Sequence, residues 1–253
     1  LNRAEHRLHL RCELPHHTTL PLFEKLVGRE PVSLVSLMDH SPGQRQFANI
    51  EKYREYYQGK YALNDAEMAR YEEEQLQLAA RWSQPNRLSI AAMCRDRNIA
   101  LASHDDATHD HVRESHQLGS VIAEFPTTFE AAEASRKHGM NVLMGAPNIV
   151  RGGSHSGNVA ASKLASLGLL DILSSDYYPA SLLDAAFRVA DDEGNSFTLP
   201  QAIRLVTKNP ASALNLHDRG EIAEGKRADL VLAHRKGEHI HIDHVWRQGK
   251  RVF

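Results

Sequence analysis

Residues 99–111, IALASHDDATHDH, decide the fold, because an apolar run ends abruptly on His104, Asp105 and Asp106. The run has the length and composition of a buried β-strand. Three other apolar runs end in the same way: LHLRCE on Glu13, LVSLMDH on His40 and DILSSD on Asp176. Ligand chemistry collects at the carboxyl ends of parallel strands in α/β proteins. The pattern therefore predicts a parallel α/β fold with its functional groups at one edge.

Helical patterns separate these runs along the chain. We expect strands over residues 7–13, 32–39, 98–104, 120–125, 141–146 and 170–175. The longest helix is expected over 64–83. A helix over 127–139 is expected to begin with a capping box at Thr127 and Glu130, and one over 198–210 to end at Pro210. Strands that alternate with helices indicate a parallel sheet or barrel.

The last forty or so residues have a different pattern. Apolar and polar residues alternate there, with a turn expected at Lys236-Gly237, which is typical of antiparallel strands. We therefore expect one α/β domain over residues 1–215 and a small β module over 216–253.

Composition and charge exclude several classes of protein. The formal net charge of -2 argues against a nucleic-acid-binding or membrane-surface protein. No apolar run approaches the roughly 20 residues that span a bilayer. The two cysteines, Cys12 and Cys94, stand in apolar surroundings, so we expect no disulfide framework and a reducing cytoplasm. The sequence leaves assembly into a homo-oligomer open.

The four strand ends could together hold a metal ion. Side chains alternate along a strand, so each of these polar groups can lie at one level above a layer of mostly small side chains. Carboxylates and imidazoles are the ligands of catalytic zinc and similar divalent ions, which lower the pKa of bound water to about 7. A spare carboxylate can then accept the proton. The alternative is that each group forms ordinary loop hydrogen bonds. The expected metal site comprises Glu13, His40, His104 and Asp176, with Asp176 as the catalytic base.

Other histidines are expected to face water. His109, His111 and His116 lie on an expected helix beside acidic residues, and HIHIDH at 239–244 reads as the solvent face of a strand.

Two loops are candidates for binding the substrate. APNIVRGGSHSGN, residues 146–158, combines an arginine with glycines that let backbone N–H groups turn toward an anion, although a flexible turn is the alternative. It lacks the residue order of a P-loop, so this class of nucleotide triphosphatase is not supported. DHSPGQRQF, residues 39–47, is a similar loop. The candidate substrate-binding residues are Gln44, Arg45, Arg151, Gly152, Gly153 and His155.

Residues 198–232, TLPQAIRLVTKNPASALNLHDRGEIAEGKRADLVL, resemble the closing segment of the amidohydrolase superfamily. HLRCELPHH, LMDHSPGQRQF, LASHDDAT and LSSDYYPASLLDAAFRV resemble its branch of ribosyl-triphosphate diphosphatases of the carbon–phosphorus lyase pathway. The resemblance covers essentially the whole chain. It implies a metal-bearing (β/α)8 TIM-type barrel followed by strands of a small β-sandwich.

The resemblance also implies an activity. Members of this branch hydrolyse α-D-ribose 1-methylphosphonate 5-triphosphate to the 5-phosphate and diphosphate, with one or two divalent ions. Zinc is the first expectation, with manganese or magnesium as alternatives. Glu13 would end the fourth barrel strand, His40 and His104 the fifth and sixth, and Asp176 the eighth. The alternative is another enzyme of this superfamily, which cleaves a cyclic amide or deaminates a ring. A non-catalytic scaffold would have no need for these residues together.

One departure from the superfamily pattern stands out. Its first-strand metal motif, an HxH or HxD pair, has no counterpart before Glu13. We therefore expect a partial barrel, the C-terminal part of a longer protein. A barrel without its first strands would expose sheet edges, so we expect this fragment alone to be weakly stable, prone to aggregate and inactive.

Overall fold

The computed structural model describes all residues except 1–2, 30, 155–156 and 238. The described residues form two compact units. One unit is Arg7–Met140, and the other is Asn141–Phe253 with the first residues of the chain. The expected domain boundary near residue 216 falls inside the second unit, between its last helix and its antiparallel strands. This domain boundary stays a prediction.

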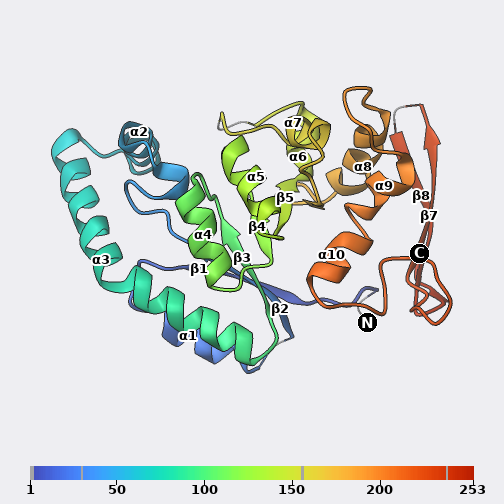
Figure 1. The fold of residues 1–253 in the computed structure, drawn as a ribbon, viewed down its shortest axis with the longest axis horizontal. Helices are drawn as coiled ribbons and strands as arrows, with labels where there is room; N and C mark the ends of the chain where they lie inside the picture. Colours follow the sequence, from blue (N-terminus) through green and yellow to red (C-terminus); the bar gives the residue numbers. More distant parts are fainter. Residues whose placement is uncertain (1–2, 30, 155–156, 238) are drawn as a thin grey trace. The chain divides into compact units, whose positions relative to one another are not determined.

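The unit Arg7–Met140 contains a parallel sheet whose strands follow one another in chain order. Its strands are β1 (Leu8–Glu13), β2 (Val32–Met38), β3 (Ala100–His104) and β4 (Ile122–Glu124). The helices of this unit are α1 (Thr19–Val27), α2 (Ile50–Tyr61), α3 (Asp65–Asp96), α4 (His109–Gln117) and α5 (Phe129–Lys137), with the 3-10 turn η1 (Arg45–Phe47) (Figure 1). The strand pairs place Glu13 opposite Met38 and His104 opposite Glu124, so the polar strand ends lie at one edge.

The core of this unit lies between the sheet and helices α1 and α3. Leu14, Val35 and Ile90 are fully buried in one apolar cluster, together with Cys12 and Cys94. Both cysteines are free. The sequence prediction that neither belongs to a disulfide framework agrees with this arrangement.

Both thiols should react slowly. Burial raises the pKa of Cys12 and of Cys94 to about 12, whereas an exposed thiol has a pKa of about 8.5. We expect a thiol reagent such as Ellman's reagent at pH 8 to label the folded chain more than about 100-fold more slowly than the chain in urea. Equal rates in the two conditions would show that this core opens readily.

Helix α3 ties the loop after β1 to the rest of the unit. Its first turn carries a capping box between Asn64 and Glu67. It continues through Pro85 to Asp96, beyond the expected end at residue 83. Asn86 then donates hydrogen bonds to the carbonyl oxygens of Leu14 and His16, at 2.8 and 2.9 Å. Helix α3 thereby fixes the chain immediately after Glu13.

Helix α5 begins one residue later than the sequence predicted. Thr128 is its N-cap, and the Thr128 hydroxyl accepts a hydrogen bond from the Ala131 N–H at 3.1 Å. The expected cap at Thr127 was therefore wrong, because Thr127 donates its own N–H to the Asp106 carbonyl and belongs to the preceding loop. Gly139 follows the helix with φ +76°, a conformation that favours glycine.

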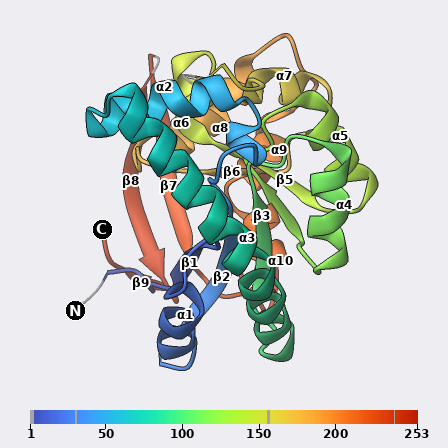
Figure 2. The same cartoon turned by 90° about the vertical axis from the view of Figure 1, so that its left-hand side faces the viewer.

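The second unit contains a parallel strand pair and an antiparallel sheet. The parallel pair is β5 (Asn141–Gly145) and β6 (Ile172–Ser174), and the antiparallel sheet is β7 (Leu230–Lys236), β8 (His239–Arg247) and β9 (Lys250–Arg251). Figure 2 shows β7 and β8 side by side. The helices of this unit are α6 (Ala146–Arg151), α7 (Ala161–Ser166), α8 (Ser181–Asp191), α9 (Leu199–Arg204) and α10 (Lys208–Ala213).

The predicted helix end at Pro210 was wrong. Helix α9 already stops at Arg204, and Pro210 lies in the first turn of α10. Proline is tolerated there because N–H groups of the first turn have no partner within a helix.

The fold class agrees with the sequence prediction. Parallel strands alternate with helices in a partial (β/α)8 arrangement of the TIM type, and a small antiparallel sheet follows. Among the described helices, none is long and apolar enough to cross a membrane.

Candidate metal centre

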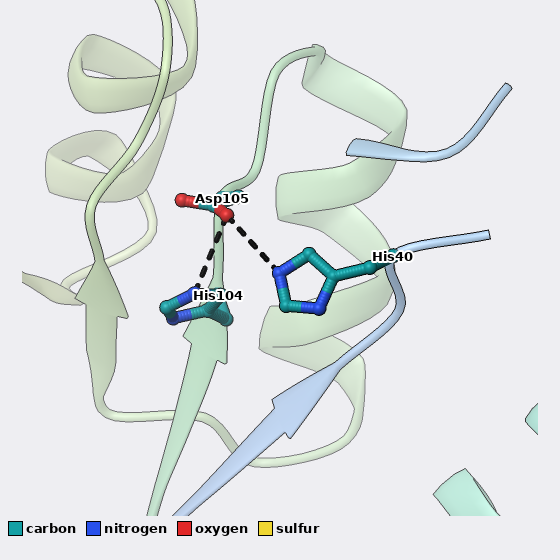
Figure 3. Close-up of side chains that lie close together, drawn as sticks. All are labelled: His40, His104 and Asp105. Atoms are coloured by element: carbon teal, nitrogen blue, oxygen red, sulfur yellow. Dashed lines mark ion pairs between the residues drawn. The ribbon is translucent and has the colours of Figure 1, made fainter. Parts of the chain in front are cut away.

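His40, His104 and Asp105 converge at the polar edge of the first unit (Figure 3). His104 is the last residue of β3, and Asp105 follows it. The Asp105 Oδ2 atom lies 3.3 Å from His104 Nε2 and 3.6 Å from His40 Nε2. One ligand atom from each residue lies within 4.8 Å of the other two. Asp105 has φ +56°, a left-handed conformation that aspartate tolerates better than most residues.

Glu124 and Arg11 together determine which nitrogen of His104 carries the proton. His104 Nδ1 lies 2.7 Å from Glu124 Oε2, and both residues are buried. Arg11 Nη2 lies 3.2 Å from His104 Nε2. A guanidinium can only donate, so the Nε2 atom accepts this bond and the Nδ1–H donates to Glu124. His104 is thus the tautomer with its proton on Nδ1, and its Nε2 lone pair accepts from Arg11.

Glu13 plays the same part for His40. One Glu13 carboxylate oxygen accepts a hydrogen bond from the backbone N–H of His40 at 3.0 Å. The other lies 2.6 Å from the ring nitrogen Nδ1 of His40. Burial disfavours the charged ring, but the carboxylates of Asp105 and Glu13 outweigh it and raise the pKa of His40 to about 9. Burial likewise opposes ionisation of Glu13, but the hydrogen bonds and charge of His40 outweigh it and lower the pKa of Glu13.

These residues fit a divalent metal ion. Two imidazole nitrogens and one carboxylate oxygen form a ligand set that zinc commonly takes. Each histidine also makes a hydrogen bond from its other nitrogen to a carboxylate, the outer arrangement that orients metal-binding histidines. Glu13, predicted as a ligand, instead bonds to His40 with both oxygens here, and its role as a ligand stays a prediction.

Asp176 belongs to the other unit. It follows the last residue of β6 by two positions, is exposed and has φ +47°. Its Oδ2 atom would lie 3.4 Å from a Cβ atom at Gly145, so a small residue at the end of β5 leaves room for this carboxylate. The proposed part of Asp176 in catalysis stays a prediction.

The predicted substrate-binding residues have different environments. Gln44 is exposed, and its predicted substrate contact stays a prediction. Arg45 is buried and paired with Asp106 and Glu114, so its cation does not face an open loop, and this arrangement does not support the predicted substrate contact. The reason is that carboxylates from later elements enclose Arg45.

The glycine-rich loop is described in part. Arg151 is exposed and donates a hydrogen bond to the Tyr177 hydroxyl at 3.0 Å. Gly152 ends α6 with φ +80°, which favours glycine, and the Gly153 N–H donates to the Asn148 carbonyl at 2.9 Å. His155 lies outside the described residues.

Two residues of this centre were not predicted from the sequence. Asp105 was noticed at the strand end but was not chosen as a ligand, and Glu124 was not singled out. Glu124 carries the same signal as Glu13, because each is an acid at the last position of its strand. His109 and His116 are exposed, as expected. His111 is half-buried and accepts a hydrogen bond from the Ala107 N–H at 3.3 Å.

Glu124 should contribute to metal affinity although it is not one of the three converging residues. Replacing Glu124 with glutamine removes the negative charge that orients the His104 ring. We expect the affinity of the chain for zinc to fall about 10- to 100-fold, as is typical when an outer partner of a metal-binding histidine is lost. Competition with a chromophoric chelator measures this, with the exposed Glu130→Gln as control. Equal affinities for both variants would contradict the assignment.

Comparisons with known proteins show the family of this chain and the proteins that it is similar to. The sequence model of the amidohydrolase family matches residues 12–253. An α-D-ribose 1-methylphosphonate 5-triphosphate diphosphatase from Escherichia coli (strain K12) is 88% identical over 253 residues, which is 100% of this chain and 67% of that protein. An adenine deaminase from Ligilactobacillus salivarius is 34% identical over 125 residues, 46% of this chain and 21% of that protein. The crystal structure of Helicobacter pylori aminofutalosine deaminase aligns with a TM-score of 0.49 and 14% identity, over 92% of this chain and 72% of that one.

Proposed function

Because the chain belongs to the amidohydrolase family, we propose that it hydrolyses α-D-ribose 1-methylphosphonate 5-triphosphate to the 5-phosphate and diphosphate, in the use of organic phosphonates. The observation that carries this proposal is the 88% identity to the E. coli diphosphatase over the whole chain. The chain spans 67% of that relative, so the proposal concerns a protein completed with the remaining residues. The deaminase alternative has weaker support, 34% identity over 46% of the chain.

The cofactor is a divalent metal ion, and we propose zinc before manganese or magnesium. His40 Nε2, His104 Nε2 and an Asp105 carboxylate oxygen would hold it, and the imidazole nitrogens favour zinc over magnesium. When bound, such an ion supplies Lewis acidity and lowers the pKa of a water to about 7. Glu13 and Glu124 keep the two histidines oriented.

The remaining roles belong to the loops at the strand ends. Asp176 is proposed to accept the proton of the attacking water, because it is an exposed carboxylate two positions after the end of β6. Arg151, Gln44 and the backbone of Gly152 and Gly153 are proposed to contact the phosphates. Phosphoryl transfer depends mainly on positioning and on cancelling charge, so the exposed cation of Arg151 suits this part.

Release of diphosphate tests the proposal. The substrate is incubated with this chain and with the chain completed by the residues of the E. coli relative that it does not match. We expect zinc-dependent diphosphate release from the completed chain and much less from the 253 residues alone. Ammonia release from adenine by the completed chain, without diphosphate release from the triphosphate, would favour the deaminase alternative and overturn the proposal.

Arg151 gives a test of substrate binding. Replacing Arg151 with alanine in the completed chain removes a cation and leaves Tyr177 without this hydrogen bond. We expect KM to rise about tenfold with a smaller change in kcat, because a charged hydrogen bond contributes roughly 1.5–3 kcal/mol. The exposed Arg136→Ala serves as control. An unchanged KM would remove Arg151 from the proposed site.

The proposed partner is this small-molecule triphosphate. Two free, buried thiols are compatible with a reducing cytoplasm, which we propose as the compartment. A homo-oligomer stays open to measurement.

A further inference from the structure

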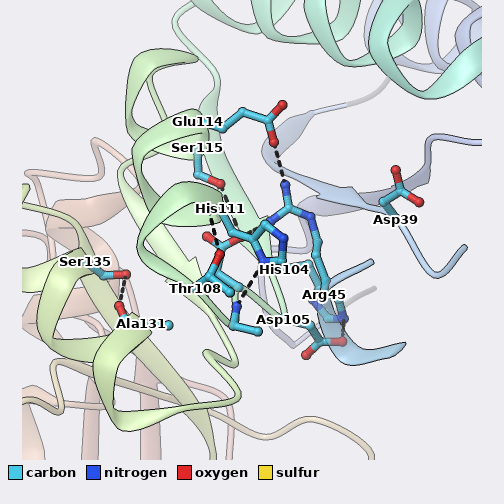
Figure 4. Close-up of polar contacts among 12 residues, drawn as sticks. Asp39, Arg45, His104, Asp105, Thr108, His111, Glu114, Ser115, Ala131 and Ser135 are labelled. Atoms are coloured by element: carbon cyan, nitrogen blue, oxygen red, sulfur yellow. Dashed lines mark hydrogen bonds and ion pairs between the residues drawn. The ribbon is translucent and has the colours of Figure 1, made fainter. Parts of the chain in front are cut away.

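A buried network of charges lies behind the metal centre. Arg45 is paired with Asp106 and donates to Glu114 Oε2 at 3.1 Å (Figure 4). Arg87 donates to the other Glu114 oxygen at 2.7 Å and to Asp39 Oδ2 at 3.3 Å. Both arginines and both aspartates are buried. We call these five residues the buried charge network.

The network begins and ends beside the converging residues. Asp39 directly precedes His40, and its Oδ1 atom accepts a hydrogen bond from the Ser41 N–H at 3.2 Å. Asp39 therefore holds the turn on both sides of His40.

The other end of the network holds the turn after β3. Asp106 directly follows Asp105, and Asp106 Oδ1 also accepts a hydrogen bond from the Ser115 hydroxyl at 3.3 Å. Its carbonyl oxygen accepts the Thr127 N–H at 3.0 Å. The backbone that carries His104 and Asp105 is thus tied to α4 and to the loop after β4.

Stability alone does not explain these ion pairs. Removing two charges from water costs several kcal/mol, and well-packed apolar residues of similar volume are often as stabilising as a buried pair. The same unit fills its other interior with apolar side chains such as Leu14, Val35 and Ile90. Arginine pairs differ from apolar contacts in direction, because the planar guanidinium fixes where each carboxylate lies.

We propose that Arg45 and Arg87 are positioning residues, which set the separation of His40 from His104 and Asp105 and thereby the affinity and geometry of the metal site. Arg45 acts through Asp106 and Arg87 acts through Asp39, with Glu114 joining the two arginines. The inference rests on the metal centre of the proposed function, and it gives Arg45 a different part from the substrate contact expected from the sequence.

The test removes one whole pair, and Glu114 keeps its ion pair with Arg87. Arg45→Met combined with Asp106→Asn is compared with Arg54→Met combined with Glu72→Gln. The second pair joins α2 and α3 at 2.6 Å, is more exposed and is not part of the network, so it controls for the loss of an ion pair elsewhere in the same unit. In the completed chain, zinc affinity is measured by chelator competition, site geometry by the visible spectrum of bound cobalt(II), and folding by thermal unfolding with a chelator present.

We expect at least a tenfold loss of zinc affinity and a changed cobalt spectrum in the first double variant, with neither change in the control. A folded first variant with the original affinity and spectrum would overturn the inference. If the first double variant does not fold, the single variant Arg45→Lys provides the test. Lysine keeps the charge but loses the planar fork, so an unchanged cobalt spectrum and affinity would overturn the inference equally.

These readouts separate the inference from the proposed activity. Metal binding that depends on the buried charge network, with no diphosphate release by the completed chain, would overturn the proposed substrate alone. Diphosphate release together with metal binding that is indifferent to the network would overturn the positioning role alone. If the completed chain without substitutions binds neither zinc nor cobalt, the positioning role is also overturned.

Discussion

Replacing His104 with alanine is expected to abolish tight zinc binding. The change removes one of the three converging ligand atoms and also the hydrogen-bond partner of Glu124. Loss of an outer partner costs about 10- to 100-fold in metal affinity, and loss of a ligand should exceed that range. Equilibrium dialysis followed by metal analysis measures the bound zinc per chain.

The control for this experiment is His116→Ala, which removes an exposed imidazole from α4. Because His104→Ala leaves the Glu124 carboxylate buried, far-ultraviolet circular dichroism must show that the variant is folded. His104→Gln keeps a polar side chain there and serves as a second variant. Zinc binding by either folded variant at the level of His116→Ala would exclude His104 as a ligand.

Replacing Asp176 with asparagine is expected to have the largest effect on turnover. Asparagine has nearly the same shape but cannot accept a proton, so the completed chain should lose about 100- to 10,000-fold in kcat, the usual contribution of a general base. Zinc binding through His40, His104 and Asp105 should largely remain. Diphosphate release at saturating substrate tests the expected loss of kcat. Analysis of the bound zinc tests whether the metal site remains.

Glu193→Gln is the control for this second experiment, because Glu193 is an exposed carboxylate of the same unit. A normal kcat in Asp176→Asn would end the assignment of Asp176 as base. Loss of both zinc and turnover would indicate that Asp176 is mainly a ligand.

The local sequence was sufficient to predict most of the elements. The six expected parallel strands agree with β1 to β6 to within about two residues at each end, because buried strands are apolar runs bounded by polar and turn residues. The antiparallel module was equally predictable from its alternating apolar and polar residues and its turn at Gly237. The helix ends were less predictable. Thr127 and Thr128 both suit a cap, and only the hydrogen bond of Thr127 to Asp106 decides between them.

The candidate site was predictable only in part. His104 ends β3 and His40 lies two positions after the end of the neighbouring β2. Both positions follow from the order of apolar runs, so the sequence by itself determined that two imidazoles meet at one edge. The sequence did not determine which carboxylate supplies the third ligand atom. Asp105 and Asp106 are adjacent acids, and only the left-handed backbone of Asp105 places its carboxylate between the two rings.

The tertiary structure alone decided what each charged group faces. Arg45 stands on a polar loop next to His40, where an exposed cation was the natural prediction. Its partners Asp106 and Glu114 lie 61 and 69 positions later in the chain, and no local pattern reports so distant a pairing. The chain's own order of apolar and polar residues therefore determined the strands and the two histidines at their ends. Long-range packing decided that Glu124 orients one histidine, that Glu13 orients the other, and that Arg45 is enclosed, because the energy of a charge depends on the groups that folding brings around it.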